Sequence, residues 1–204
     1  MKKTNNYWMA VLVFVLTMVL LYGGTLFISL VAAVGGAVMG GDRALDLVER
    51  FIMENQNLLS CLIYIVPGAV FLTWYYFAFV EKRSVRQTLA SHTRRLTPAC
   101  FGWVVLLGFA VQHVISLIMA LIYVLLPSAM DQYTEMIDSS GITEYSILWA
   151  VATLILPPIV EETIFRGLIL QYLGRAGAGF VVANLIQAVL FGVFHMNLVQ
   201  GIYT

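Results

Sequence analysis

The chain has 204 residues, of which 61% are hydrophobic and 11% are charged, and its formal net charge is +0. Soluble domains carry charge on about a quarter of their residues, so this composition and the mean hydropathy of +0.90 exclude an ordinary water-soluble protein. We expect an integral membrane protein that lies in a lipid bilayer. The balanced charge gives no indication of nucleic-acid binding.

Five apolar segments are long enough, or nearly so, to cross a bilayer, which takes about 20 mostly apolar residues. The first, residues 7–34, follows Lys2-Lys3 and exceeds the core of about 7–15 residues found in a signal peptide, so we expect it to be retained. These long runs predict an all-α polytopic transmembrane helical bundle in which residues 1–204 form a single integral membrane domain. The other segments are residues 57–80, 99–126, 146–173 and 179–203.

Basic residues occur in alternate loops between these segments. The N-terminus has two lysines, the loop after the second segment is strongly basic, and the loop before the fourth segment has acidic residues but no Lys or Arg. By the positive-inside rule, we expect the N-terminus in the cytoplasm. The basic residues of the second loop are Lys82, Arg83, Arg86, Arg94 and Arg95.

A glycine-rich stretch, residues 174–179, separates the fourth and fifth segments. Its glycines favour a helix stop and a tight turn, which would make these two segments an antiparallel hairpin. Glu161 and His195 are equally far along the chain from the centre of this turn. They are therefore predicted to lie at the same depth in the membrane, roughly 25 Å along each helix from the turn.

The fourth segment contains Glu161, Glu162 and Arg166, although ionisable side chains are costly within a bilayer. Glu162 and Arg166 are four residues apart and are predicted to pair. Glu161 lies about 100° round the helix from Glu162, which leaves it free to act as a base. Pro157-Pro158 precede these residues and are expected to open the helix and admit water.

On the fifth segment, Asn184, Gln187, Phe191 and His195 are spaced by three, four and four residues. This spacing predicts one stripe that faces protein or a water-filled cavity. A carboxylate and an imidazole at one depth could activate a water molecule for attack on a peptide carbonyl, alone or with a bound divalent metal. The structural alternative is that a Glu–Arg pair locks two helices together and the histidine only hydrogen-bonds a neighbour.

The motif Glu161-Glu162-x-x-x-Arg166, followed by Phe191-x-x-x-His195 on the next helix, resembles a known family. It is the CAAX-processing and bacteriocin-processing (CPBP) intramembrane protease family, which contains the type II CAAX prenyl endopeptidases, and the similar region is residues 146–204. The resemblance implies an endopeptidase with catalytic glutamates, an orienting arginine, and a histidine that activates water or binds metal. Members are described as glutamate proteases or as metalloproteases, and the sequence leaves both open.

The family pattern also has a later helix, with a further histidine followed four residues on by Asn or Asp. The chain ends at Thr204 without this motif. We therefore expect a C-terminally truncated catalytic region, in a fragment or a truncated product that lacks part of the site.

These observations predict an intramembrane endopeptidase of a bacterial cell membrane that cleaves membrane-associated peptides or proteins. Glu161 is the expected base, Glu162 and Arg166 support it, and His195 orients the water. If a metal takes part, a divalent ion such as zinc would be held by Glu162 and His195. Two alternatives come from other classes: a non-catalytic immunity or scaffold protein of the same family, and a proton-coupled transporter in which the cluster relays protons.

Overall fold

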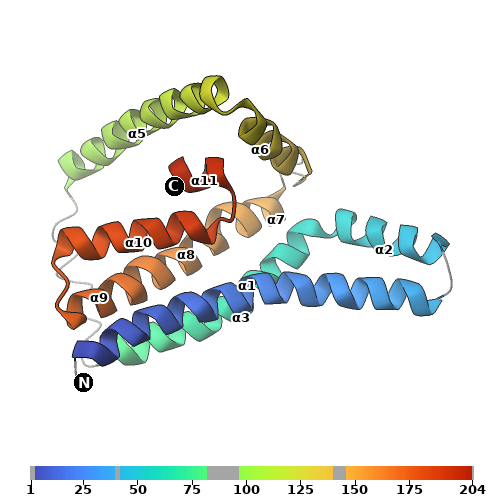
Figure 1. Ribbon diagram of the computed structural model, residues 1–204, viewed down its shortest axis with the longest axis horizontal. Helices are drawn as coiled ribbons and strands as arrows, with labels where there is room; N and C mark the ends of the chain where they lie inside the picture. Colours follow the sequence, from blue (N-terminus) through green and yellow to red (C-terminus); the bar gives the residue numbers. More distant parts are fainter. Residues whose placement is uncertain (1–2, 40–41, 82–96, 140–145, 204) are drawn as a thin grey trace. The chain divides into compact units, whose positions relative to one another are not determined.

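All regular structure in the described part of the chain is helical, which confirms the all-α prediction (Figure 1). The computed structural model describes residues 3–39, 42–81, 97–139 and 146–203. Within these ranges, the helices long and apolar enough to cross a membrane correspond to the first four predicted segments. They are Thr4–Val38, Gln56–Val80, Pro98–Leu125 and Ile147–Ala176. The basic residues from Lys82 to Arg95, on which the predicted orientation depends, lie outside the described residues.

The chain divides into two compact units. The first comprises Met1–Thr73 and Ile137–Leu190, and the second comprises Trp74–Met136 and Phe191–Thr204. The prediction of a single integral membrane domain stays a prediction.

In the first unit, α1 (Lys3–Met39) packs along η3 (Thr163–Ile169) and α9 (Leu170–Ala176) (Figure 1). Its buried side chains recur every three or four residues, as expected for one face of a helix. The facing side chains of η3 are almost completely buried as well, so apolar side chains on both helices form the core of this unit. The buried residues of α1 are Asn6, Ala10, Val13, Thr17, Leu21 and Gly36.

The predicted turn after the fourth segment is confirmed. The helix α9 ends at Ala176, and Gly177 adopts the left-handed conformation with φ 99°, which glycine reaches without steric cost. The amide of Ala178 then donates to the carbonyl oxygen of Leu173 at 3.1 Å, as in a glycine-based helix stop. The next helix, α10, covers Phe180–Phe194.

The prediction of one continuous helix over residues 179–203 is wrong. The helix α10 has 15 residues and ends at Phe194, and a second helix, α11, covers Leu198–Tyr203. Between them, Met196 has a positive φ of 52°. The Asn197 side chain accepts a hydrogen bond from the Gln200 amide at 3.0 Å, so Asn197 caps a new helix.

Two glycines allow α11 to fold closely against the end of α10 in the second unit. A Cβ atom added to Gly192 would lie 2.7 Å from the carbonyl oxygen of Gly201, and one added to Gly201 would lie 2.8 Å from that of Gly192. The helix α11 also contacts α5 (Pro98–Leu125). These contacts fix the direction of the chain after His195.

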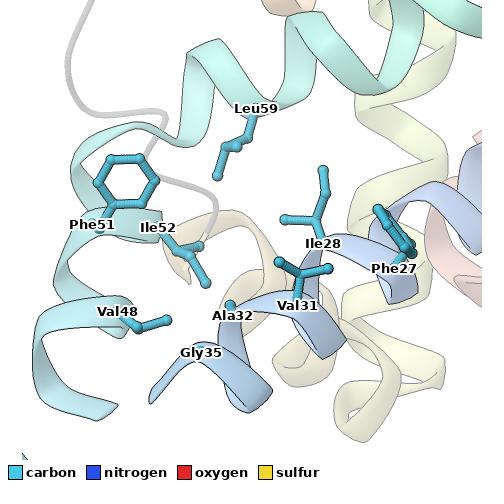
Figure 2. A pocket seen from close by; sticks show the side chains of 9 residues that line it. All are labelled: Phe27, Ile28, Val31, Ala32, Gly35, Val48, Phe51, Ile52 and Leu59. Atoms are coloured by element: carbon cyan, nitrogen blue, oxygen red, sulfur yellow. The ribbon is translucent and has the colours of Figure 1, made fainter. Parts of the chain in front are cut away.

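The polar stretches between the predicted spans also contain helices, which the sequence analysis treated as loops. In the first unit, α2 (Asp42–Glu54) leads into α3 (Gln56–Tyr75), and its apolar residues Val48 and Ile52 line a cavity against α1 and α3 (Figure 2). The remaining elements are η1 (Tyr76–Val80), α6 (Pro127–Ser139), α7 (Ile147–Ala150), η2 (Val151–Ile155) and α8 (Leu156–Glu162).

The glycine contact predicts a specific loss of stability. Gly192→Val should lower the free energy of unfolding by about 1–3 kcal/mol, because the new side chain overlaps backbone atoms that cannot rotate away. Gly108→Val is the matched control, since nothing lies within 4 Å of a Cβ at that position of α5. Denaturation of the intact protein in detergent measures both effects, and equal stability of the two variants would contradict the close approach.

Candidate active site

The fourth span continues through its proline pair instead of breaking. Pro157 and Pro158 lie in the first turn of α8, where a missing amide hydrogen is tolerated. The preceding turn is the π-helix η2, in which the Leu156 amide donates to the Val151 carbonyl. The expected opening of the helix is therefore replaced by a widened turn. A second π-helix, η3, follows Glu162, and such widened turns are frequent at functional sites.

Glu162 and Arg166 form the predicted ion pair, through an Arg166 Nη1 hydrogen bond to Glu162 Oε1. Both side chains lie on the helix surface, with 55% of Glu162 and 50% of Arg166 exposed. Each charge therefore has an opposite charge beside it, one turn away on the same helix.

Glu161 has a different partner. Its Oε1 atom accepts a hydrogen bond from the hydroxyl of Tyr64 on α3 at 3.1 Å, across a sequence separation of 97 residues. Within the described part of the chain, Glu161 forms no ion pair. Glu161 is half-buried and lies close to the middle of the 30-residue span Ile147–Ala176. The site thus holds two adjacent carboxylates, one paired with a cation and one with a neutral hydroxyl.

The helices α3 and α8 approach each other closely at one point near Tyr64 and Glu161. A Cβ atom added to Gly68 would lie 3.1 Å from a methyl carbon of Val160, so a larger residue would push the helices apart. Gly68 lies four residues after Tyr64, on the same face of α3, and Val160 directly precedes Glu161. Tyr22 of α1 is also near enough to Glu161 to interact with it electrostatically.

Sequence analysis missed Tyr64. It lies inside the second span, away from both ends, where a buried phenol hydroxyl usually has a hydrogen-bond partner. That expectation is a signal that could have singled out the residue. It does not identify the partner, because the contact is between helices distant in the sequence.

His195 lies directly after the end of α10, in the corner before α11, and not within a helix. Its ring contacts that of Phe191 edge-on, with 4.9 Å between the ring centres, and that of Phe194 at 5.3 Å. The Nε2 atom is buried and has no hydrogen-bond partner among the described residues. The second predicted motif therefore places its histidine beside two aromatic rings.

The predicted stripe on α10 is only partly buried. Gln187 is 3% exposed, but Asn184 is exposed. Ala183 and Phe194 are buried instead, so the buried face runs through 183, 187 and 194. The stripe through 184, 187, 191 and 195 lies at the edge of this face.

The structure brings Glu162 and Arg166 together and joins Glu161 to Tyr64. Glu161 belongs to the first compact unit and His195 to the second, so their meeting at one depth stays a prediction. Among the described residues, no three His, Cys, Asp or Glu side chains form a group that could hold a metal ion. The predicted ligands Glu162 and His195 belong to different units, so a metal site formed by them stays a prediction.

Comparison with known families gives one match. Residues 143–204 match the family described as type II CAAX prenyl endopeptidase Rce1-like, and this region contains all four predicted site residues. Comparison with curated proteins and with solved structures gives no match. The matched region is less than a third of the chain. The resemblance carried by the two motifs is confirmed: residues 143–204 are similar to the CAAX-type intramembrane protease family.

Proposed function

We propose that this protein is an intramembrane endopeptidase in which Glu161 activates the water that cleaves a peptide bond. The observation that carries the proposal is the partner of Glu161: a carboxylate near the middle of a membrane span is held by a neutral hydroxyl and not by a cation. The family match over residues 143–204 supports the reaction class.

A purely structural role would favour a cation beside each intramembrane carboxylate, because an unpaired charge is costly in hydrocarbon. Glu162 has such a partner in Arg166. Glu161 has Tyr64, whose hydroxyl donates one hydrogen bond and leaves the second carboxylate oxygen available. Of the two glutamates, Glu161 is therefore the one placed to accept a proton from water.

The proposed reaction has two stages. Glu161 takes a proton from water, and the resulting hydroxide oxygen bonds to the carbonyl carbon of the peptide while the carbonyl π electrons move to its oxygen. The tetrahedral intermediate then collapses, the bond from carbon to nitrogen breaks, and protonated Glu161 returns the proton to the departing amine. The products are a carboxylic acid and an amine.

His195 would orient the attacking water in this scheme. Its Nε2 atom is not bound by any described residue, and the rings of Phe191 and Phe194 restrict the imidazole. Glu162 and Arg166 would keep their part of the helix neutral overall. Participation of a divalent ion such as zinc at Glu162 and His195 stays a prediction from the sequence.

The substrates would be membrane-associated peptides or proteins, because a base near mid-span acts on bonds that enter the bilayer. The N-terminus is proposed to lie in the cytoplasm, and the host membrane to be a bacterial cell membrane. The orientation is inferred from the charges of the loops, and the bacterial membrane from the family resemblance.

Glu161→Gln tests the proposed base. The amide can still accept the Tyr64 hydrogen bond but cannot take a proton, so proteolysis should fall by at least about 100-fold. The measurement uses the intact protein in liposomes with a library of quenched fluorescent peptides that carry an apolar segment. Glu49→Gln, at an exposed position of α2, is the matched control and should keep wild-type activity. Normal cleavage by Glu161→Gln would disprove the role of Glu161.

Tyr64→Phe tests whether the hydroxyl positions Glu161. A hydrogen bond to a charged group contributes about 1.5–3 kcal/mol, so kcat should fall about tenfold or more while KM stays within about twofold. Tyr123→Phe removes a hydroxyl from an exposed tyrosine of α5 and should change neither value. An unchanged kcat for Tyr64→Phe, or a rise in KM alone, would show that the hydroxyl does not act through Glu161.

A further inference from the structure

Polar side chains form two short rows on two mostly apolar helices of the first unit. Gln56, Ser60 and Tyr64 recur every four residues on α3, and Thr25 and Ser29 are four apart on α1. Residues at this spacing share a helix face. Polar groups on membrane-spanning helices face protein or a water-filled space, so the two rows indicate what lies between these helices.

The two rows line the same cavity. It has a volume of about 330 Å³, and its polar lining consists of all five of these residues, with apolar side chains between them. The cavity is open at the surface of the unit, where Thr25 and Ser29 are exposed. A cavity that is both polar and roomy is the kind that water fills, whereas a purely apolar one tends to stay dry.

A neighbouring cavity shows that this polarity is local. The same three helices, α1, α2 and α3, line an open space of about 270 Å³ whose lining residues are all apolar (Figure 2). Its lining includes Phe27, Val31 and Phe51. The polar side chains are therefore gathered in one of two adjacent cavities rather than spread over both.

The hydroxyls that line the polar cavity remain able to bind water. Thr25 donates to the carbonyl oxygen of Leu21 at 3.1 Å, and Ser29 donates to that of Thr25 at 3.0 Å. A hydroxyl oxygen that donates its proton still has lone pairs to accept hydrogen bonds from water. These side chains therefore satisfy their own donors and present acceptors to the cavity.

Tyr64 connects the cavity to the proposed base. It lines the cavity, and its hydroxyl donates to Glu161 at 3.1 Å. Gln56, at the other end of the row, is the first residue of α3, and the eight residues from there to Tyr64 rise roughly 12 Å. The cavity thus leads from the end of a membrane span to the residue that holds Glu161.

We infer that water reaches Glu161 through this cavity. The water enters at the end of the first unit where α2 leads into α3. The use of the water rests on the proposed function, because a hydrolase consumes one water for each bond cleaved. The path itself is a physical property that can be measured without proteolysis.

Cysteine labelling tests the path. The intact protein is made with its two cysteines, Cys61 and Cys100, replaced by alanine, and single variants Ser29→Cys and Ser60→Cys are placed in liposomes opened by freezing and thawing. A charged, membrane-impermeant methanethiosulfonate reagent is added. Both introduced thiols should react at least about tenfold faster than lipid-facing ones, because the reactive thiolate is favoured in water and disfavoured in lipid.

The matched controls are Leu30→Cys and Leu62→Cys, which lie within two residues of the test positions. Leu30 is 61% exposed and Leu62 is 50% exposed, and neither lines the polar cavity. Equal rates at the test and control positions would overturn the path.

Combining this assay with proteolysis separates the two proposals. Fast labelling in a protein whose cleavage activity survives Glu161→Gln would support the path and reject the proposed base. Slow labelling at both serine positions, in a protein whose cleavage needs Glu161, would reject the path and leave the proposed base in place.

Discussion

A carboxylate inside a bilayer is stable only with a hydrogen-bond or ionic partner. In the first unit, the hydroxyl of Tyr64 is that partner for Glu161. This hydrogen bond is accompanied by a close approach of α3 to α8, where Gly68 faces Val160 without a side chain of its own. One missing methyl group thus allows the contact between helices that holds the proposed base. An unpartnered carboxylate at this depth would be costly in hydrocarbon. The Gly68–Val160 contact and the Tyr64–Glu161 hydrogen bond therefore both favour the same position of α3 against α8.

The two adjacent glutamates show how one helix can give similar side chains different environments. A step of one residue rotates a side chain by about 100°, which directs Glu161 toward α3 and leaves Glu162 on the surface beside Arg166. The arginine is four residues from Glu162 and five from Glu161, so it pairs with the nearer neighbour on its own face. The widened turn η3 begins directly after Glu162, and the motif therefore spans the junction between two helix types.

Sequence reasoning succeeded where the determining interactions are local. Long apolar runs predicted the four spans, Gly177 predicted the helix stop, and the spacing of four predicted the ion pair of Glu162. It failed where distant segments or short caps decide the outcome. Tyr64 could not be assigned to Glu161, because the order of helices in space does not follow from hydropathy. The corner at His195 was missed because an asparagine cap interrupts a run that remains apolar on average.

That corner gives the histidine a fixed local environment that does not depend on the other motif. Asn197 starts α11, the Gly192–Gly201 contact folds α11 against α10, and the Tyr203 hydroxyl bonds to that of Tyr133 at 3.0 Å. All of these contacts lie within the second unit, just as the contact of Tyr64 with Glu161 lies within the first. Each half of the predicted site is therefore held by its own unit.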